Sequence, residues 1–123
     1  MSANSSLNNR QADWESQAQM LRAIAHPVRL QILDALRDGP LCVNDVNALV
    51  SISQPQLSQH MAALRKLGIV ACHINGPLRC YYVSRPTLVK RLLRICAEEH
   101  PVVEKDRATV VREAAKRRGS GST

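Results

Sequence analysis

Phenylalanine is absent from this chain, and its aromatic residues are one tryptophan and two tyrosines. Any hydrophobic core must therefore be aliphatic, built from Leu, Ile, Val, Ala and Met. The 123 residues, of which 45% are hydrophobic, suffice for one compact domain and not for two. A small aliphatic core stabilises a lone monomer only marginally. We therefore expect a homodimer, in which a second copy covers further apolar surface.

Acidic side chains are scarce as well, since 10 Asp and Glu face 17 Lys and Arg and leave a net charge of +7. This balance favours an anionic partner such as nucleic acid, although a solvated basic surface without a ligand has the same charge. No apolar run approaches the roughly 20 residues that span a bilayer. The polar segment 1–11 lacks the apolar stretch of a signal peptide. We expect a cytoplasmic protein with no membrane partner, whose cysteines stay reduced by default.

The chain divides by composition into three parts. Residues 1–10 are rich in Ser and Asn and predict a disordered lead. Residues 11–100 carry the periodic hydrophobic pattern and predict one folded domain. Residues 101–123 are charged and end in Gly and Ser, which predicts a frayed helix followed by a flexible tail.

Helical periodicity recurs five times within the predicted domain. The predicted helices span residues 12–25, 27–37, 43–50, 53–67 and 86–99. Beyond Gly68, which is suited to end a helix, the β-branched and aromatic segments 69–74 and 79–84 predict two strands. Asn75-Gly76 between them is a strong hairpin-turn dipeptide. The predicted fold is mainly α with a small β-hairpin, namely five core helices plus a two-stranded wing.

Two short helices joined tightly and followed by a hairpin are typical of a winged helix-turn-helix. The helix that starts at Ser53 has the features that base recognition needs. Ser53 and Gln56 match a capping box, and amides left free at this end can hold a phosphate. With Leu57 at the centre of the buried side, the opposite side carries the polar Gln59 and Lys66. Glutamine can bond adenine in the major groove, whereas lysine reaches phosphates.

Three segments together resemble the ArsR/SmtB family of bacterial repressors, namely residues 21–36, 53–67 and 68–84. The resemblance covers roughly residues 12–100. It implies a homodimer whose first and last helices form the interface, and which represses transcription from a palindromic double-stranded DNA operator. It also implies a regulator and not an enzyme. The DNA contacts expected from the periodicity and the resemblance are Ser53, Gln54, Gln56, Ser58, Gln59, His60, Lys66 and Arg79, with Arg79 in the wing and His60 facing inward.

Many members of that family release DNA when a metal, a metalloid or an oxidant binds cysteines or histidines. Arsenic-responsive members carry three cysteines entering the third helix, whereas residues 41–47 of this chain keep only Cys42. A single thiolate cannot form a three-sulfur site. The last helix lacks the spaced Asp and His residues of the family's zinc and nickel sites, so the metal ligands are unknown.

Three interpretations of the four cysteines remain open. Cys42 and Cys96 can form a redox or metalloid pair, within or across subunits, that takes arsenite or another soft ion. Cys72 and Cys80 can pair across the hairpin, because they are symmetric about Gly76 and opposite each other in one register. Alternatively, the cysteines are small hydrophobic residues and the repressor has no cysteine-based inducer.

Other classes of function have less support. The sequence contains no Gly-rich phosphate loop, no metalloprotease-type histidine pair and no Gly-x-Ser-x-Gly turn. A winged helix used for protein contact or RNA binding is the remaining alternative. Its affinity for random DNA would equal its affinity for an operator.

Overall fold

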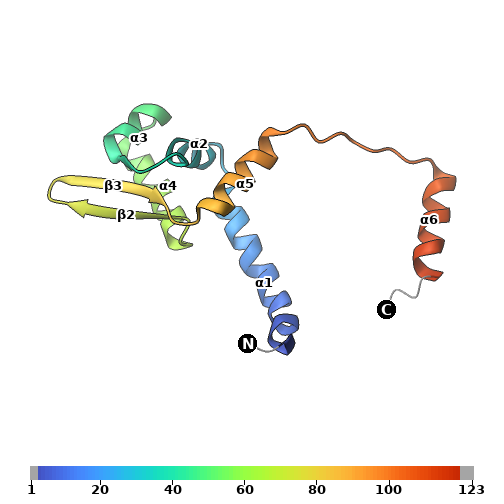
Figure 1. The fold of residues 1–123 in the computed structure, drawn as a ribbon. Helices are drawn as coiled ribbons and strands as arrows, with labels where there is room; N and C mark the ends of the chain where they lie inside the picture. Colours follow the sequence, from blue (N-terminus) through green and yellow to red (C-terminus); the bar gives the residue numbers. More distant parts are fainter. Residues whose placement is uncertain (1–2, 120–123) are drawn as a thin grey trace.

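The computed structural model describes residues 3–119, and the side chains from residue 13 onward. This part of the chain forms six helices and three strands, and Figure 1 labels the helices and the strands β2 and β3. Their bounds are α1 (Ala3–Ile24), α2 (Pro27–Leu36), β1 (Leu41–Cys42), α3 (Val43–Val50), α4 (Gln54–Lys66), β2 (Val70–Asn75), β3 (Leu78–Val83), α5 (Pro86–Ala97) and α6 (Arg107–Gly119). The winged helix-turn-helix predicted from the sequence is confirmed, and the structure adds the short strand β1 to it.

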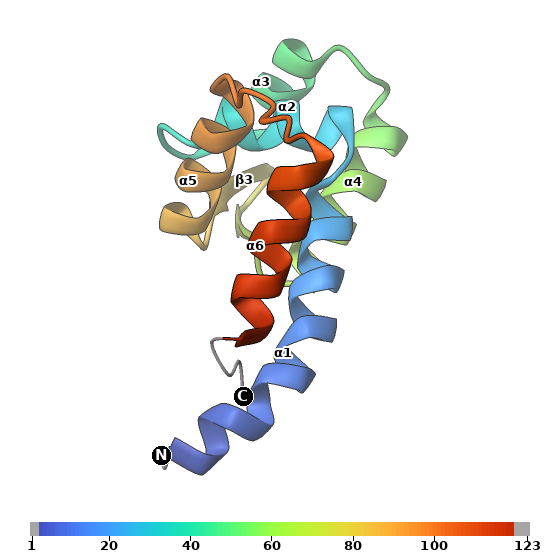
Figure 2. The same cartoon turned by 90° about the vertical axis from the view of Figure 1, so that its right-hand side faces the viewer.

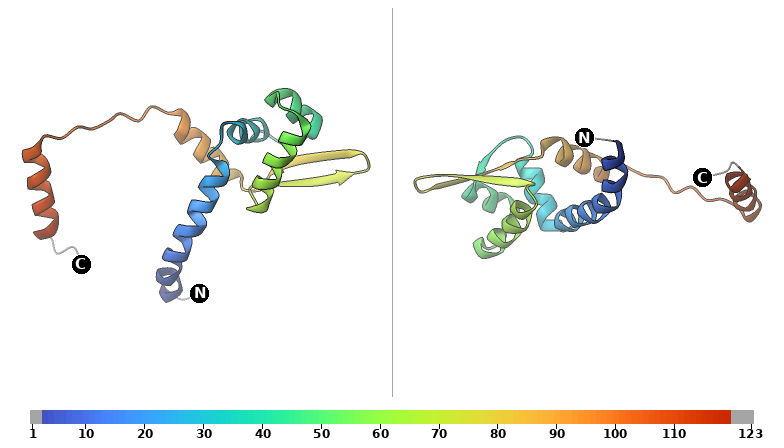
Figure 3. Two further views of the ribbon diagram at one scale, coloured as in Figure 1. Left: turned by 180° about the vertical axis from the view of Figure 1, so that it is seen from behind. Right: turned by 90° about the horizontal axis from the view of Figure 1, so that it is seen from below.

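The helices α2, α3 and α4 pack together beside the hairpin, while the N-terminal part of α1 projects away from them (Figures 1 and 3). The helix α6 stands off from this body at the end of an extended segment (Figure 3). It runs in the opposite chain direction to α1 (Figures 1 and 2). No helix in residues 3–119 is long and apolar enough to cross a membrane.

The core lies between α2, α3, α4 and the inner face of the sheet. Its aliphatic character is confirmed, with Tyr81 as the one aromatic side chain among the buried residues from 13 to 119. Tyr82, the next residue on β3, is half-buried, as expected for neighbours on opposite faces of a strand. The buried residues are Ile24, Ile32, Leu33, Leu36, Val46, Val50, Leu57, Met61, Leu64, Ile69, Val70, Tyr81 and Val89.

The wing belongs to a three-stranded antiparallel sheet with the order β1-β3-β2. The short strand β1 was not predicted from the sequence. On the other side of β3, Asn75 pairs with Leu78, so the turn contains only Gly76 and Pro77. Gly76 has φ +61°, which suits the first central residue of a tight hairpin turn. This two-residue turn fixes the register of every pair along the hairpin.

The predicted pairing of Cys72 with Cys80 is wrong. Cys72 lies opposite Tyr81, and Cys80 lies opposite His73. The prediction centred the hairpin on Gly76. A hairpin centred on one residue has an odd number of residues in its turn, whereas this turn has two. A shift of one residue moves a side chain to the other face of a sheet, so Cys72 and Cys80 face opposite ways.

The helix α1 begins at Ala3, whereas residues 1–10 were predicted to be a disordered lead. The prediction is therefore wrong for residues 3–10, while residues 1 and 2 lie outside the described part. Ser and Asn favour caps and turns over helix interiors, which motivated the prediction. Adding residues to an existing helix is much easier than nucleating one, however, and the segment from Trp14 onward supplies the nucleus.

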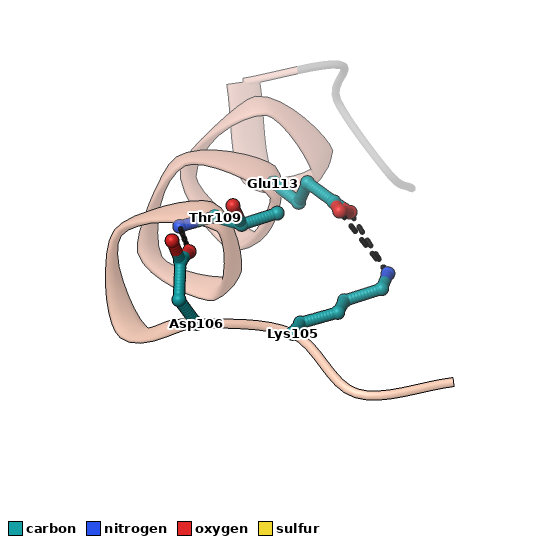
Figure 4. Close-up of polar contacts among 4 residues, drawn as sticks. All are labelled: Lys105, Asp106, Thr109 and Glu113. Atoms are coloured by element: carbon teal, nitrogen blue, oxygen red, sulfur yellow. Dashed lines mark hydrogen bonds and ion pairs between the residues drawn. The ribbon is translucent and has the colours of Figure 1, made fainter. Parts of the chain in front are cut away.

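The helix α6 is held by local contacts that Figure 4 shows. The Thr109 amide donates to an Asp106 carboxylate oxygen at 2.8 Å, as at many helix N-termini. Hydrogen bonds from the Thr109 side chain and backbone hold the pKa of Asp106 below its usual range. The Lys105 ammonium lies 2.9 Å from the Glu113 carboxylate. The helix predicted in the charged C-terminal extension is therefore present, and residues 120–123 of the predicted flexible tail lie outside the described part.

Candidate nucleic-acid interface

The N-terminus of α4 is closed by the capping box predicted from the sequence. The Gln56 amide donates to Ser53 Oγ at 3.3 Å, and the Ser53 amide donates to Gln56 Oε1 at 3.2 Å. The Ser53 hydroxyl donates to the same Gln56 oxygen at 3.1 Å. Bidentate recognition of adenine uses both the oxygen and the nitrogen of a glutamine amide. Gln56 must therefore release its cap oxygen before it can read a base.

The two sides of α4 are divided as the periodicity predicted. Leu57, Met61 and Leu64 are buried at helical spacing. Among the predicted DNA contacts, Gln54, Ser58, Gln59 and Lys66 are exposed. The first turn carries no acidic side chain, whereas Arg65 and Lys66 are basic residues in the last turn. This face therefore presents amide, hydroxyl and cationic groups to solvent.

Both connections of α4 are tight. Before the helix, Ser51 adopts the left-handed conformation with φ 59°, and its amide donates to the Asn47 carbonyl. This bend joins α3 to α4 through Ser51 and Ile52, the connection predicted from the sequence. After the helix, Gly68 with φ +70° donates to Arg65, and Ile69 donates to Leu64, which is a Schellman motif.

A histidine pair anchors the inward side of α4. The His60 ring lies 4.5 Å from the ring of His26, centroid to centroid, and Arg29 Nε donates to His60 Nδ1 at 3.1 Å. Burial lowers the pKa of His60, and the charges of His26 and Arg29 lower it further. The unfolded chain takes up this proton at higher pH than the folded chain, so folding weakens as pH falls through the usual histidine range. His60 therefore packs on the inward side of α4, as predicted from the sequence.

His26 and Arg29 join α4 to α1 and α2. His26 caps α2, because its Nδ1 accepts a hydrogen bond from the Val28 amide at 3.0 Å. Arg29 also donates to the Ala23 carbonyl at the end of α1, at 2.9 Å. The function of Arg29 was not predicted from the sequence. An arginine in an amphipathic helix gives no signal that its partners lie on two other helices.

The wing presents one cation near its turn. Arg79 is exposed on β3 and lies opposite Ile74, which is 68% exposed. Leu78 next to the turn is 52% exposed. The base of the wing is fixed to α4, because the Ser84 hydroxyl and Arg85 Nε both donate to the Gly68 carbonyl, at 2.7 and 3.2 Å. The C-terminal end of α4 and the base of the wing are therefore joined at the Gly68 carbonyl.

The cysteines are arranged differently from either predicted pair. Cys42 lies opposite Cys80 in the pairing of β1 with β3, and their sulfur atoms are 3.1 Å apart. All four cysteines are free thiols. Cys72 packs partly against the core, and Cys96 is exposed on α5. Within one chain the partner of Cys42 is therefore Cys80 and not Cys96. A contact between Cys42 and Cys96 across subunits stays a prediction.

The hydrogen bond between the two sulfurs raises the pKa of the Cys42 thiol, and partial burial and the Asp45 carboxylate raise it further. The raised pKa disfavours the thiolate form of Cys42. No group of three or more His, Cys, Asp or Glu side chains suited to a metal ion occurs in the described part of the chain.

Replacing Ser53 by alanine is expected to lower the free energy of unfolding by about 1 kcal/mol, because the cap of α4 is lost. Ser58→Ala is the matched control, since Ser58 is exposed on the same helix and takes no part in the cap. Its effect should stay within about 0.5 kcal/mol. Urea unfolding followed by circular dichroism measures both. Equal stabilities of the two variants would contradict the capping box.

Known proteins resemble this chain in sequence. The family model described as bacterial regulatory protein, arsR family, matches residues 26–71. The Biofilm growth-associated repressor of Xylella fastidiosa (strain 9a5c) is 38% identical over 86 residues, which are 67% of this chain and 75% of that protein. The chain belongs to the ArsR family of bacterial regulatory proteins. The transcriptional activator HlyU of Vibrio cholerae is 36% identical over 76 residues, covering 62% of this chain and 69% of HlyU.

Solved structures of transcription regulators share the fold. Reduced HlyU from Vibrio cholerae N16961 superposes with a TM-score of 0.66 at 29% identity, covering 73% of this chain and 98% of HlyU. The transcriptional repressor BigR from Xylella fastidiosa has a TM-score of 0.62 at 27% identity, covering 80% of this chain and 100% of BigR. This ArsR-family chain is therefore a DNA-binding transcription regulator and not an enzyme.

Proposed function

We propose that this ArsR-family chain is a sequence-specific repressor that binds a palindromic DNA operator as a homodimer. The observation that carries the proposal is the exposed polar face of α4, held between the tight bend at Ser51 and the wing. A helix in this position of a helix-turn-helix lies in the major groove with its N-terminal residues on base edges. That function requires access to chromosomal DNA, which agrees with the expected cytoplasmic location.

The predicted contacts have different functions in this proposal. Gln54, Ser58 and Gln59 are exposed and outside the capping box, so their amides and hydroxyl are free for base edges. Lys66 and Arg79 hold phosphates, and Arg79 can also enter a narrow minor groove. The remaining predicted contacts are Ser53, Gln56 and His60. Ser53 and Gln56 are engaged in the capping box and His60 faces inward, so each contributes less to DNA binding than the exposed residues.

The dimer is supported by apolar side chains that one chain leaves uncovered. Trp14 and Leu21 lie seven residues apart on α1, hence on one side of the helix, and are 63% and 50% exposed. Ile95 on α5 is 57% exposed. Contiguous exposed apolar surface commonly marks an interaction site. In a dimer formed by covering α1 and α5, the two α4 helices must lie about 34 Å apart to enter successive major grooves.

Release from DNA by a thiol-reactive signal, either a metalloid such as arsenite or an oxidant, is part of the proposal. The contact between Cys42 and Cys80 supports it, because two adjacent thiols can be oxidised to a disulfide or supply two of the sulfur ligands of a soft ion. The competing form is a repressor with no cysteine-based inducer.

The decisive experiment selects a DNA duplex from a random-sequence library with the reduced, full-length chain. The selected duplex should bind more tightly than a scrambled one, and raising the salt should weaken both. Equal affinity for the selected and the scrambled duplex would contradict the repressor proposal and favour an RNA-binding or protein-contact module.

Two single substitutions then separate base readers from phosphate contacts. Gln59→Ala is expected to reduce the preference for the selected duplex about tenfold, as the loss of one bidentate base contact does. Lys66→Ala is expected to weaken both duplexes alike and to lower the salt dependence. Fluorescence anisotropy titrations at two salt concentrations measure this. If Gln59→Ala left the preference intact, the assignment of this face would be wrong.

A further inference from the structure

The sulfur atoms of Cys42 and Cys80 are placed for a reversible bond. Residues directly opposite in antiparallel strands have Cα atoms about 4.5–5.5 Å apart, which falls within the separation that disulfides require. The register makes Cys42 and Cys80 such a pair. Their sulfurs lie 3.1 Å apart, about an ångström longer than a disulfide bond. The backbone geometry of the reduced chain therefore already suits the oxidised form.

The other thiols do not share these features. Cys72 lies on the core side of β2 and fits the description of a small hydrophobic residue. Cys96 is exposed on α5 and has no thiol within hydrogen-bonding distance in residues 13–119. Cys42 and Cys80 are each only half-buried, so a small oxidant can reach them. Cys42 and Cys80 are therefore the two thiols whose oxidation would give a disulfide.

We propose that Cys42 and Cys80 form a peroxide-sensitive dithiol that weakens DNA binding when it is oxidised. The proposal rests on the function proposed above, and it specifies that function's signal and its site. It commits to an oxidant, because one arsenite ion prefers three thiolates and this site offers two.

The reaction needs one peroxide molecule for each pair. One of the two sulfurs, as a thiolate, attacks a peroxide oxygen and becomes a sulfenic acid, and the O–O bond breaks to release water after protonation. The second sulfur then attacks the sulfenic sulfur and displaces its hydroxyl group as a second water. Two thiols and one peroxide give one disulfide and two waters, so the sulfurs lose two electrons and the peroxide gains two. A dithiol reductant reverses the step by thiol–disulfide exchange.

The position of the pair connects its redox state to the DNA-binding face. Cys42 immediately precedes α3, and its side chain makes no capping hydrogen bond. Cys80 lies on β3 of the wing. A disulfide would therefore fasten the first helix of the helix-turn-helix to the wing. The bond would hold the start of α3 at a fixed distance from the wing. It would therefore limit the adjustment of these two elements to each other when both contact DNA.

The expected result is a disulfide together with a fall in DNA affinity. Treatment with hydrogen peroxide should lower the number of free thiols in the full-length chain from four to two. The duplex selected by the reduced chain should bind about tenfold more weakly, equivalent to one lost base contact, and dithiothreitol should restore it. Trypsin can map the bond, because Arg65 and Arg79 separate the peptides that carry Cys42, Cys72 and Cys80, and Lys90 separates Cys96.

Matched variants identify the pair. Cys42→Ser and Cys80→Ser should each abolish both the disulfide and the peroxide response, whereas Cys72→Ser and Cys96→Ser should retain them. Using both members of the pair guards against one variant that fails to fold. A disulfide at another pair, no disulfide, or a mapped Cys42–Cys80 bond with unchanged affinity would each overturn the proposal.

The thiol count and the peptide map need no DNA, so they separate this proposal from the repressor proposal. If the reduced chain showed no preference for its selected duplex, the repressor function would fail while the disulfide could still form. If arsenite instead of peroxide released the duplex, and did so only when both Cys42 and Cys80 were present, the oxidant would be the wrong signal.

Discussion

Replacing Leu57 by alanine is expected to lower the free energy of unfolding by about 2–5 kcal/mol. Leu57 is fully buried at the centre of the inner side of α4, with Met61 and Leu64 along the same side. Truncation removes its apolar contacts and leaves a cavity that the aliphatic core fills only in part. A domain of this size is commonly stable by only about 5–15 kcal/mol, so the loss is a large fraction of the total.

The control for this substitution is Leu49→Ala on α3. Leu49 is 66% exposed, so the same chemical change there removes few contacts. Its effect should stay within about 0.5 kcal/mol. Urea unfolding measured by circular dichroism compares the two variants. Similar losses at the two positions would show that α4 does not pack as described.

Replacing Leu21 by glutamate is expected to convert the proposed dimer to monomers. Leu21 is half exposed on α1, where a second copy would cover it. A carboxylate there would be desolvated on association without a partner, at a cost of several kcal/mol. Affinity for the selected duplex should fall by about 100-fold or more, because two linked half-site contacts become independent.

Sedimentation velocity and anisotropy titrations on the same samples test both parts. Val102→Glu is the matched control, since Val102 is 86% exposed beyond the end of α5 and outside the proposed interface. It should leave the oligomeric state and the affinity unchanged. A Leu21→Glu protein that remained dimeric would rule out α1 as the interface, without contradicting the DNA-binding function.

Local patterns sufficed to predict the helix-turn-helix. The inward side of α4 follows from apolar residues at a 3.6-residue period, and its two ends follow from Ser53, Gln56 and Gly68. Each of these signals acts over a few neighbouring residues, so the sequence displays it directly.

The thiol pair could not be predicted in the same way. β1 contains only Leu41 and Cys42, too few residues for any period to be visible, and its partner is 38 residues away. The length of the turn at Gly76 and Pro77 then decides which face Cys80 takes. An error of one residue in that turn is enough to pair Cys80 with the wrong thiol. Likewise, nothing near Arg29 in the sequence indicates its bonds to His60 and Ala23.

The near-absence of aromatic residues has a spectroscopic consequence. The chain has one tryptophan, and Trp14 is 63% exposed on α1, in the surface proposed to meet the second copy. All indole fluorescence therefore originates from that surface and none from the core. Dilution that separates two subunits would return the indole to water and shift its emission to longer wavelength, whereas unfolding of an already separate subunit would change it little. The chain thus carries its own optical probe of subunit association.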